Sequence, residues 1–131
     1  MRTPLRRVLS LLRPDDLVVA PHDCYGGTYR LLVARRDRKQ FDVTFVAQGN
    51  QEALIAALAQ RPKLVLVETP SNPLMRVVDI RVIAAHARAV GAKTAVDNTF
   101  LSPALQRPIA LGADFVIHST TKYLNGHSDV V

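Results

Sequence analysis

The residues best suited to chemistry lie near the end of the sequence, around one lysine. Lys122 follows an apolar run at residues 115–117 and a group of hydroxyl residues that includes Ser119 and Thr121. A lysine at the mouth of a buried strand is partly desolvated, so its amine loses proton affinity and can act as a nucleophile. The hydroxyls three and one residues before it are placed to hold an anion. A Schiff-base lysine beside an anion site is what pyridoxal phosphate (PLP) requires. The same residues could instead be a surface lysine and a turn cap.

Three other polar residues follow predicted strands. The carboxylate of Asp97 comes directly behind a buried strand, where a charge is costly without a partner. Its partner could be the pyridinium nitrogen of a cofactor. Asp97 could instead cap a helix or form a structural ion pair. Tyr25 lies in a glycine-flanked loop, where its ring could stack on a cofactor or simply face solvent. Asn72 lies between prolines, where its amide could bind a ligand or stabilise the turn.

The composition and charge of the chain exclude several classes of protein function. With 48% hydrophobic and 21% charged residues, the 131-residue chain is typical of one globular domain. The net charge of +6 could indicate nucleic-acid binding, but the densest basic group, residues 35–39, contains an acid and no aromatic, so we predict no nucleic-acid partner. No apolar run is long enough for a membrane span. The single cysteine, Cys24, and the lack of a cleavage site predict a cytoplasmic protein. The four histidines lack zinc-site spacing, so we expect no metal.

Short apolar runs alternate with helical patterns along the chain. We predict strands at residues 17–20, 43–46, 64–67, 94–96 and 115–117. We predict helices at 4–12, from about Leu31, at 50–60, at 79–90 and at 103–111. In the helix at 50–60, Leu54, Ile55 and Leu58 lie on one face. Strands that are apolar on both faces are typical of a parallel sheet covered on both sides. The sequence therefore predicts an α/β fold of three layers, a mostly parallel sheet with helices on both faces. Ligands bind beyond the carboxyl ends of such strands, where all the polar residues named above fall.

Four segments resemble one enzyme family. They are APHDCYGGTYRLL, LVLVETPSNPLMRVVDI, VDNTFLSPALQRPIALGADFVIHS and TTKYLNGHSDVV, and they cover nearly everything from Leu17 onward. They are similar to the PLP enzymes of cysteine and methionine transsulfuration, which have the aspartate-aminotransferase type of fold. The form DCYGGTYRL and the last two segments are most similar to the γ-synthase branch. The γ-lyases and the O-acylhomoserine sulfhydrylases are close alternatives.

The resemblance implies a reaction and a role for each residue. Lys122 would carry PLP as a Schiff base and shuttle protons, and Tyr25 would stack on the ring and help in proton transfer. Asp97 would pair with the ring nitrogen, with Thr99 nearby, and Asn72 would lie near the ring hydroxyl. Ser119 and Thr121 would bind the phosphate. The implied reaction is γ-replacement, in which cysteine displaces the acyl group of an O-acylhomoserine to give cystathionine, a step of methionine biosynthesis.

The resemblance covers only part of the family's chain. The family's N-terminal arm and C-terminal domain are missing from residues 1–131, so we interpret the chain as a partial PLP-binding large domain. Part of the phosphate site and the arginine for the substrate carboxylate are missing too, so we expect impaired turnover. The family implies small amino-acid substrates and a homotetramer, although the arm that helps to build the tetramer is missing. The alternatives are a non-catalytic fragment that at most binds PLP and an unrelated parallel α/β binding domain.

Overall fold

Five parallel strands form the central layer of the computed structural model, which describes residues 4–127. The sheet order is β2-β1-β3-β4-β5. The strands are β1 (Leu17–Pro21), β2 (Asp42–Val46), β3 (Leu64–Glu68), β4 (Lys93–Asp97) and β5 (Phe115–Ile117), and the helices are α1 (Pro4–Leu9), α2 (Gly26–Asp37), α3 (Gln51–Leu58), α4 (Ile80–Ala89), α5 (Ser102–Leu105) and the 3-10 helix η1 (Pro108–Leu111). The predicted parallel α/β fold is confirmed.

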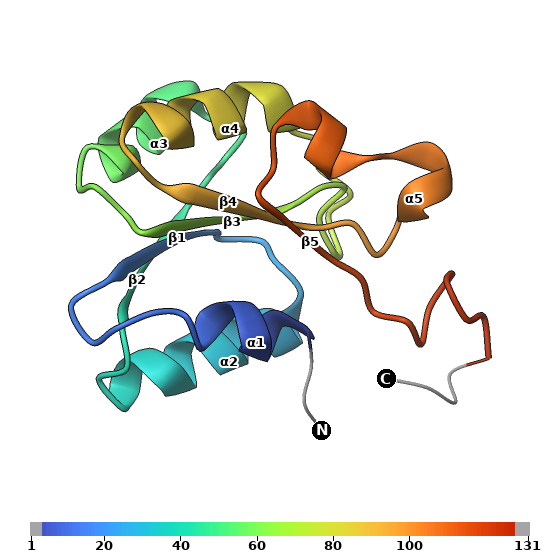
Figure 1. Cartoon of the computed structure of the whole chain (residues 1–131), viewed down its shortest axis with the longest axis horizontal. Helices are drawn as coiled ribbons and strands as arrows, with labels where there is room; N and C mark the ends of the chain where they lie inside the picture. Colours follow the sequence, from blue (N-terminus) through green and yellow to red (C-terminus); the bar gives the residue numbers. More distant parts are fainter. Residues whose placement is uncertain (1–3, 128–131) are drawn as a thin grey trace.

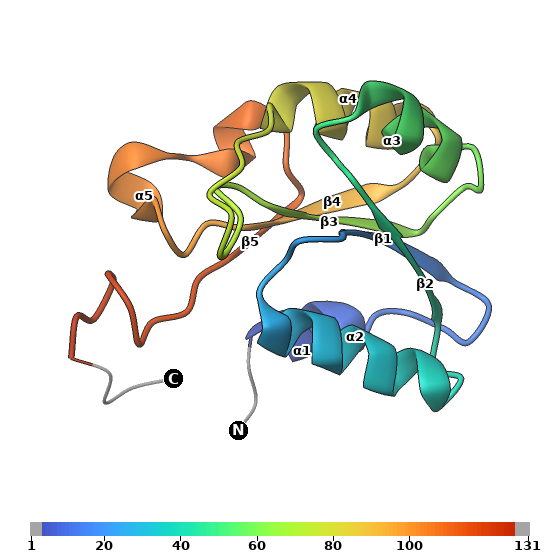
Figure 2. The ribbon, with the colours of Figure 1, turned by 180° about the vertical axis from the view of Figure 1, so that it is seen from behind.

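The helices cover both faces of the sheet, as predicted. Figure 1 shows α3 and α4 on one face and α1 and α2 on the other, and Figure 2 shows the same three layers from behind. The chain moves from β1 to β2 at one edge and then returns past β1 to β3, β4 and β5. The strand order therefore reverses between β1 and β3, and ligands bind at such a reversal in open α/β sheets.

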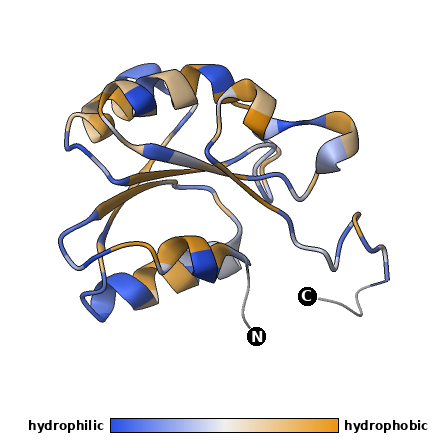
Figure 3. Ribbon diagram, in the orientation of Figure 1, coloured by the Kyte–Doolittle hydropathy of each residue, from blue (hydrophilic) through white to orange (hydrophobic). Residues whose placement is uncertain are grey.

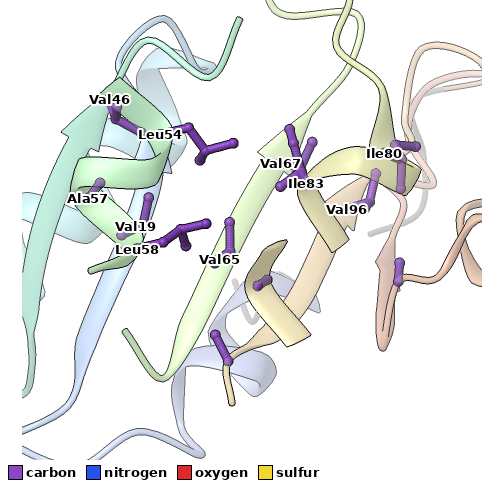
Figure 4. Close-up of a cluster of buried hydrophobic side chains, with 13 residues drawn as sticks. Val19, Val46, Leu54, Ala57, Leu58, Val65, Val67, Ile80, Ile83 and Val96 are labelled. Carbon is purple, nitrogen blue, oxygen red and sulfur yellow. The ribbon is translucent and has the colours of Figure 1, made fainter. Parts of the chain in front are cut away.

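Alternate residues of β1, β3 and β4 enter two separate apolar cores. Val65 and Val67 of β3 face α3 and α4, whereas Leu64 and Leu66 of the same strand face α1 and α2. Figure 3 shows the resulting hydrophobic colour along the strands, and Figure 4 shows side chains of α3 and α4 packed over β1, β3 and β4. Because both faces of β3 are buried, the strand reads as an unbroken apolar run in the sequence.

Three details of the helices differ from the predictions. Helix α2 begins at Gly26 and not near Leu31, and the Tyr25 N–H directly before it is bonded by a residue of β3 that is described below. The predicted helix 103–111 is split into α5 and η1, since Pro108 has no N–H to donate and the backbone of Gln106 is extended. Ile55 is 47% exposed, so only Leu54 and Leu58 of the three predicted residues enter the core.

Candidate functional site

Hydrogen bonds join four of the predicted site residues at the carboxyl edge of β4 and β5. Asp97, the last residue of β4, accepts bonds at Oδ1 from the Thr99 backbone N–H at 3.1 Å and from the Thr99 hydroxyl at 2.5 Å. The Thr99 hydroxyl oxygen accepts a bond from the Ser119 N–H at 2.9 Å. The Ser119 and Thr121 hydroxyls lie 2.9 Å apart. The structure thus brings together the carboxylate predicted for a ring nitrogen and the hydroxyls predicted for a phosphate.

The two other ring-contacting residues of the prediction are held by a residue that the sequence analysis did not select. Glu68, the last residue of β3, accepts the Tyr25 N–H at Oε2 over 3.0 Å and the Asn72 N–H at Oε1 over 2.8 Å. Glu68 is opposite Asp97 in the parallel register of β3 and β4. Its signal was present in the sequence, because a carboxylate directly behind a buried strand is costly without partners.

Burial controls the acid–base behaviour of both carboxyl groups. Burial raises the pKa of Asp97, while the two bonds from Thr99 and the charge of His118 oppose that rise. Burial likewise raises the pKa of Glu68, and the N–H groups of Tyr25 and Asn72 oppose it. A buried carboxylate whose charge is penalised in this way gains from a cationic donor.

The Asp97 side chain has a second oxygen that the bonds from Thr99 do not use. Both bonds from Thr99 end on Oδ1, so Oδ2 takes part in neither. A protonated ring nitrogen would donate to Oδ2 and offset the cost of burying the charge. The residues present therefore fit PLP at its ring nitrogen, and the paired Ser119 and Thr121 hydroxyls would be the donors to its phosphate.

The segment that carries Lys122 leaves the edge of the sheet after β5 and extends away from the layers (Figures 1 and 2). The Lys122 backbone forms a turn, with its N–H bonded to the Ser119 carbonyl at 3.2 Å and its carbonyl accepting the Gly126 N–H at 2.7 Å. The side chain is exposed. The predicted desolvation of Lys122 is therefore wrong for this structure, because no buried surface encloses the amine.

Cys24 stands next to Tyr25 but is not suited to nucleophilic chemistry. It is buried, and burial together with the nearby charge of Glu68 raises the pKa of its thiol to about 12. The thiol is thus protonated at neutral pH, whereas a nucleophilic cysteine is a thiolate.

The Tyr25 ring lies against the backbone of the first turn of α2. A Cβ atom added at Gly27 would stand 2.5 Å from the Tyr25 Cε1 atom. Tyr25 as a whole residue is 54% exposed. Only glycine at this position therefore allows the Tyr25 ring to rest where it does.

We expect Gly27→Ala to displace the Tyr25 ring without weakening the fold. Alanine favours a helix by about 1 kcal/mol over glycine, which offsets part of the local strain. NMR shifts of the Tyr25 ring should change, while urea unfolding should stay within about 1 kcal/mol of wild type. Gly26→Ala is the control, because its Cβ would meet only the flexible end of Arg30, at 3.3 Å. Equal ring shifts in both variants would contradict the prediction.

A cavity of about 440 Å³ opens beside the Glu68 carboxylate, at the carboxyl ends of β1, β2 and β3. Its polar lining includes His22, Asp23, Gln48, Glu68, Ser71 and Arg76. Asp23 accepts a bond from the Ser71 hydroxyl at 2.9 Å and lies 3.9 Å from the Arg76 guanidinium. Asp97, Ser119 and Lys122 are not among the lining residues, so this cavity is next to the predicted cofactor contacts and not around them.

Two features are absent from the described part of the chain, residues 4–127. No helix in that range is long and apolar enough to cross a membrane. No group of three or more histidine, cysteine, aspartate or glutamate side chains in the same range could hold a metal ion.

A parallel sheet with polar side chains at the carboxyl ends of its strands is the arrangement of an α/β ligand-binding protein, and comparison with known proteins shows the family. Residues 2–131 match the Cys/Met metabolism PLP-dependent enzyme family, and the chain belongs to it. Over 120 residues it is 68% identical to cystathionine gamma-synthase from Escherichia coli K12, covering 92% of this chain and 31% of that protein. Cystathionine beta-lyase from Lactococcus lactis MG1363 is 49% identical over 127 residues, 97% of this chain and 33% of that protein.

Solved structures give the same picture. Cystathionine gamma synthase from Xanthomonas oryzae pv. oryzae, in complex with aminoacrylate and cysteine, superposes with a TM-score of 0.95 at 55% identity, over 97% of this chain and 33% of that chain. Cystathionine gamma-lyase from Lactobacillus plantarum, complexed with L-serine, gives 0.92 at 40% identity over the same shares. The chain thus spans about a third of the length of these relatives.

Proposed function

We propose that the protein is a PLP-dependent enzyme that joins cysteine to an O-acylhomoserine by γ-replacement and gives cystathionine. The observation that carries this proposal is the connected set of Asp97, Thr99, Ser119 and Thr121 at the carboxyl edge of a PLP-family sheet. The choice of γ-replacement is supported by the 68% identity to a cystathionine gamma-synthase. The activity is that of the whole enzyme, of which these residues supply part.

Each residue has a defined task in this proposal. Bound PLP supplies an electron sink for the carbanions of the substrate. The Lys122 amine would attach the cofactor and, once released, take and return substrate protons at Nζ. Asp97 would hold the ring-nitrogen proton, and the Ser119 and Thr121 hydroxyls would bind phosphate oxygens. Tyr25 would stack on the ring and assist proton transfer, and Asn72 would lie near the ring hydroxyl. This placement of groups can account for several kcal/mol of the barrier.

Elimination is the second candidate. A cystathionine beta-lyase and a cystathionine gamma-lyase also resemble nearly the whole chain, and the residues named above suit both types of reaction. Transfer of sulfide to an O-acylhomoserine and PLP binding without turnover are the remaining possibilities. The proposal also includes a cytoplasmic location, which the one buried cysteine suits, and a homo-oligomer, which rests on family membership.

A product analysis tests the proposal. The purified whole enzyme is incubated with PLP, cysteine and either O-acetylhomoserine or O-succinylhomoserine, and the products are identified by mass spectrometry. We expect cystathionine as the main product, formed only when cysteine is present. If 2-oxobutanoate forms at the same rate without cysteine, or if cystathionine is itself cleaved, the protein is a lyase and the proposal is overturned.

A further inference from the structure

Glu68 connects two loops across the point at which the strand order reverses. One oxygen of its carboxylate accepts the backbone N–H of Tyr25, behind β1, and the other accepts that of Asn72, in the loop behind β3. We call this carboxylate and its two donors the Glu68 bridge. The side chain is only 8% exposed. Bonds to ionised acceptors are stronger than neutral ones, and burial removes competing water.

The two donors belong to the very residues whose side chains are proposed to contact the ring. In each case the N–H and the side chain are on the same residue. A displacement of either N–H therefore moves the corresponding side chain. Tyr25 is also the residue before the first turn of α2, and its ring rests on Gly27. Asn72 adjoins Ser71, whose hydroxyl donates to Asp23. The Glu68 bridge thus sets the place of both ring-contacting residues.

Stability alone does not require a charged carboxylate at Glu68. Two N–H groups could be accepted by neutral groups, yet a buried carboxylate is used, on the residue directly opposite Asp97 in the register of β3 and β4. Two like charges that are buried side by side are unfavourable. A carboxylate is, however, the one side-chain group with two acceptor oxygens and no donor, so it can satisfy two N–H groups in different loops at once.

We infer that Glu68 is a positioning residue, which fixes Tyr25 and Asn72 relative to Asp97 at the ring of the cofactor. This inference rests on the proposed PLP function. Glu68 itself acts through backbone N–H groups and need not contact the cofactor or the substrate.

The first test follows the bridge without any cofactor. In Glu68→Gln the side chain keeps its size, but its amide has one acceptor oxygen and an NH₂ group that faces a donor. Amide hydrogen exchange should become about tenfold faster or more at Tyr25 or Asn72. Thr69→Val is the matched control, because Thr69 is as buried and accepts one N–H, that of Val78, in the same loop. It should change exchange at Val78 only.

The second test uses the holoenzyme. Glu68→Gln should still take up PLP, but the visible circular dichroism of the bound cofactor should fall by about half or more, and kcat should fall about tenfold with little change in KM. Thr69→Val should leave both near wild type. In a Tyr25→Ala background the effect of Glu68→Gln on kcat should shrink, since the two residues act together.

The outcomes separate this inference from the proposed function. Wild-type protein that takes no PLP would overturn the proposed function, and positioning at a PLP site with it. Normal PLP uptake by wild type, with unchanged dichroism and kcat in Glu68→Gln, would overturn the positioning role alone. Equal losses in Glu68→Gln and Thr69→Val would show a general effect of loop stability and would also overturn it.

Discussion

Replacing Lys122 with alanine is expected to abolish covalent attachment of PLP and to lower turnover by about 10³-fold or more. The amine is proposed both to bind the cofactor and to transfer the proton, so its removal eliminates two functions together. The fold should be unaffected, because the Lys122 side chain is exposed and its turn is held by backbone bonds. The measurement is borohydride reduction of the PLP-loaded protein, followed by peptide mass spectrometry.

The chain offers matched controls for this experiment. Lys63 is exposed, and its bonds to Leu17 and Lys93 are made by the backbone, so Lys63→Ala should keep the label and the activity. Lys122→Arg keeps the positive charge, yet a guanidinium is not deprotonated in proteins and should not take the label. Labels spread evenly over Lys39, Lys63, Lys93 and Lys122, or a label that survives Lys122→Ala, would contradict the prediction.

The fold was predictable because its strands are buried on both faces. Leu64 to Val67 form an apolar run, and in the structure they alternate between two cores as a covered parallel strand must. Helix capping is local as well, because the Asn50 side chain accepts the Ala53 N–H only three residues along the chain. The clustering of polar residues at one edge follows from parallel strands alone, because all their carboxyl ends meet there.

What the sequence did not reveal depends on contacts between distant segments. The Tyr25 N–H directly before α2 is bonded by Glu68, which is more than forty residues away, whereas glycine propensity alone predicts a later helix start than Gly26. The role of Glu68 requires the register that places it beside Asp97. The exposure of Lys122 is a third case, because the burial of a side chain depends on what packs over it and no local motif encodes that.

Asp97→Asn is expected to weaken PLP binding about 10- to 100-fold while leaving the fold intact. A charge-assisted bond to a partly buried group contributes about 1.5–3 kcal/mol, and each 1.4 kcal/mol is a factor of ten in affinity. Asparagine keeps an oxygen that can accept both bonds from Thr99. The measurements are PLP titration by visible absorption and urea unfolding of the cofactor-free protein.

The pH dependence of both quantities distinguishes a cofactor ligand from a structural carboxylate. Burial raises the pKa of Asp97 in the folded protein, so the native state binds the proton more tightly than the unfolded chain does. The stability contributed by Asp97 is therefore complete below its unfolded pKa and is lost as pH rises through the folded value. Asp97→Asn should then be no less stable than wild type at neutral pH.

Cofactor affinity should respond to pH in the opposite direction. Only the ionised carboxylate accepts a ring-nitrogen proton well, so wild-type affinity should fall as pH is lowered through the raised pKa of Asp97. Glu68 titrates nearby, also with a raised pKa, and remains in the variant. Asp97→Asn should therefore lose the part of the pH dependence that belongs to Asp97 and keep any part from Glu68. An unchanged affinity and pH profile in Asp97→Asn would mean that Asp97 serves the fold, through Thr99 and Ser119, and not the cofactor.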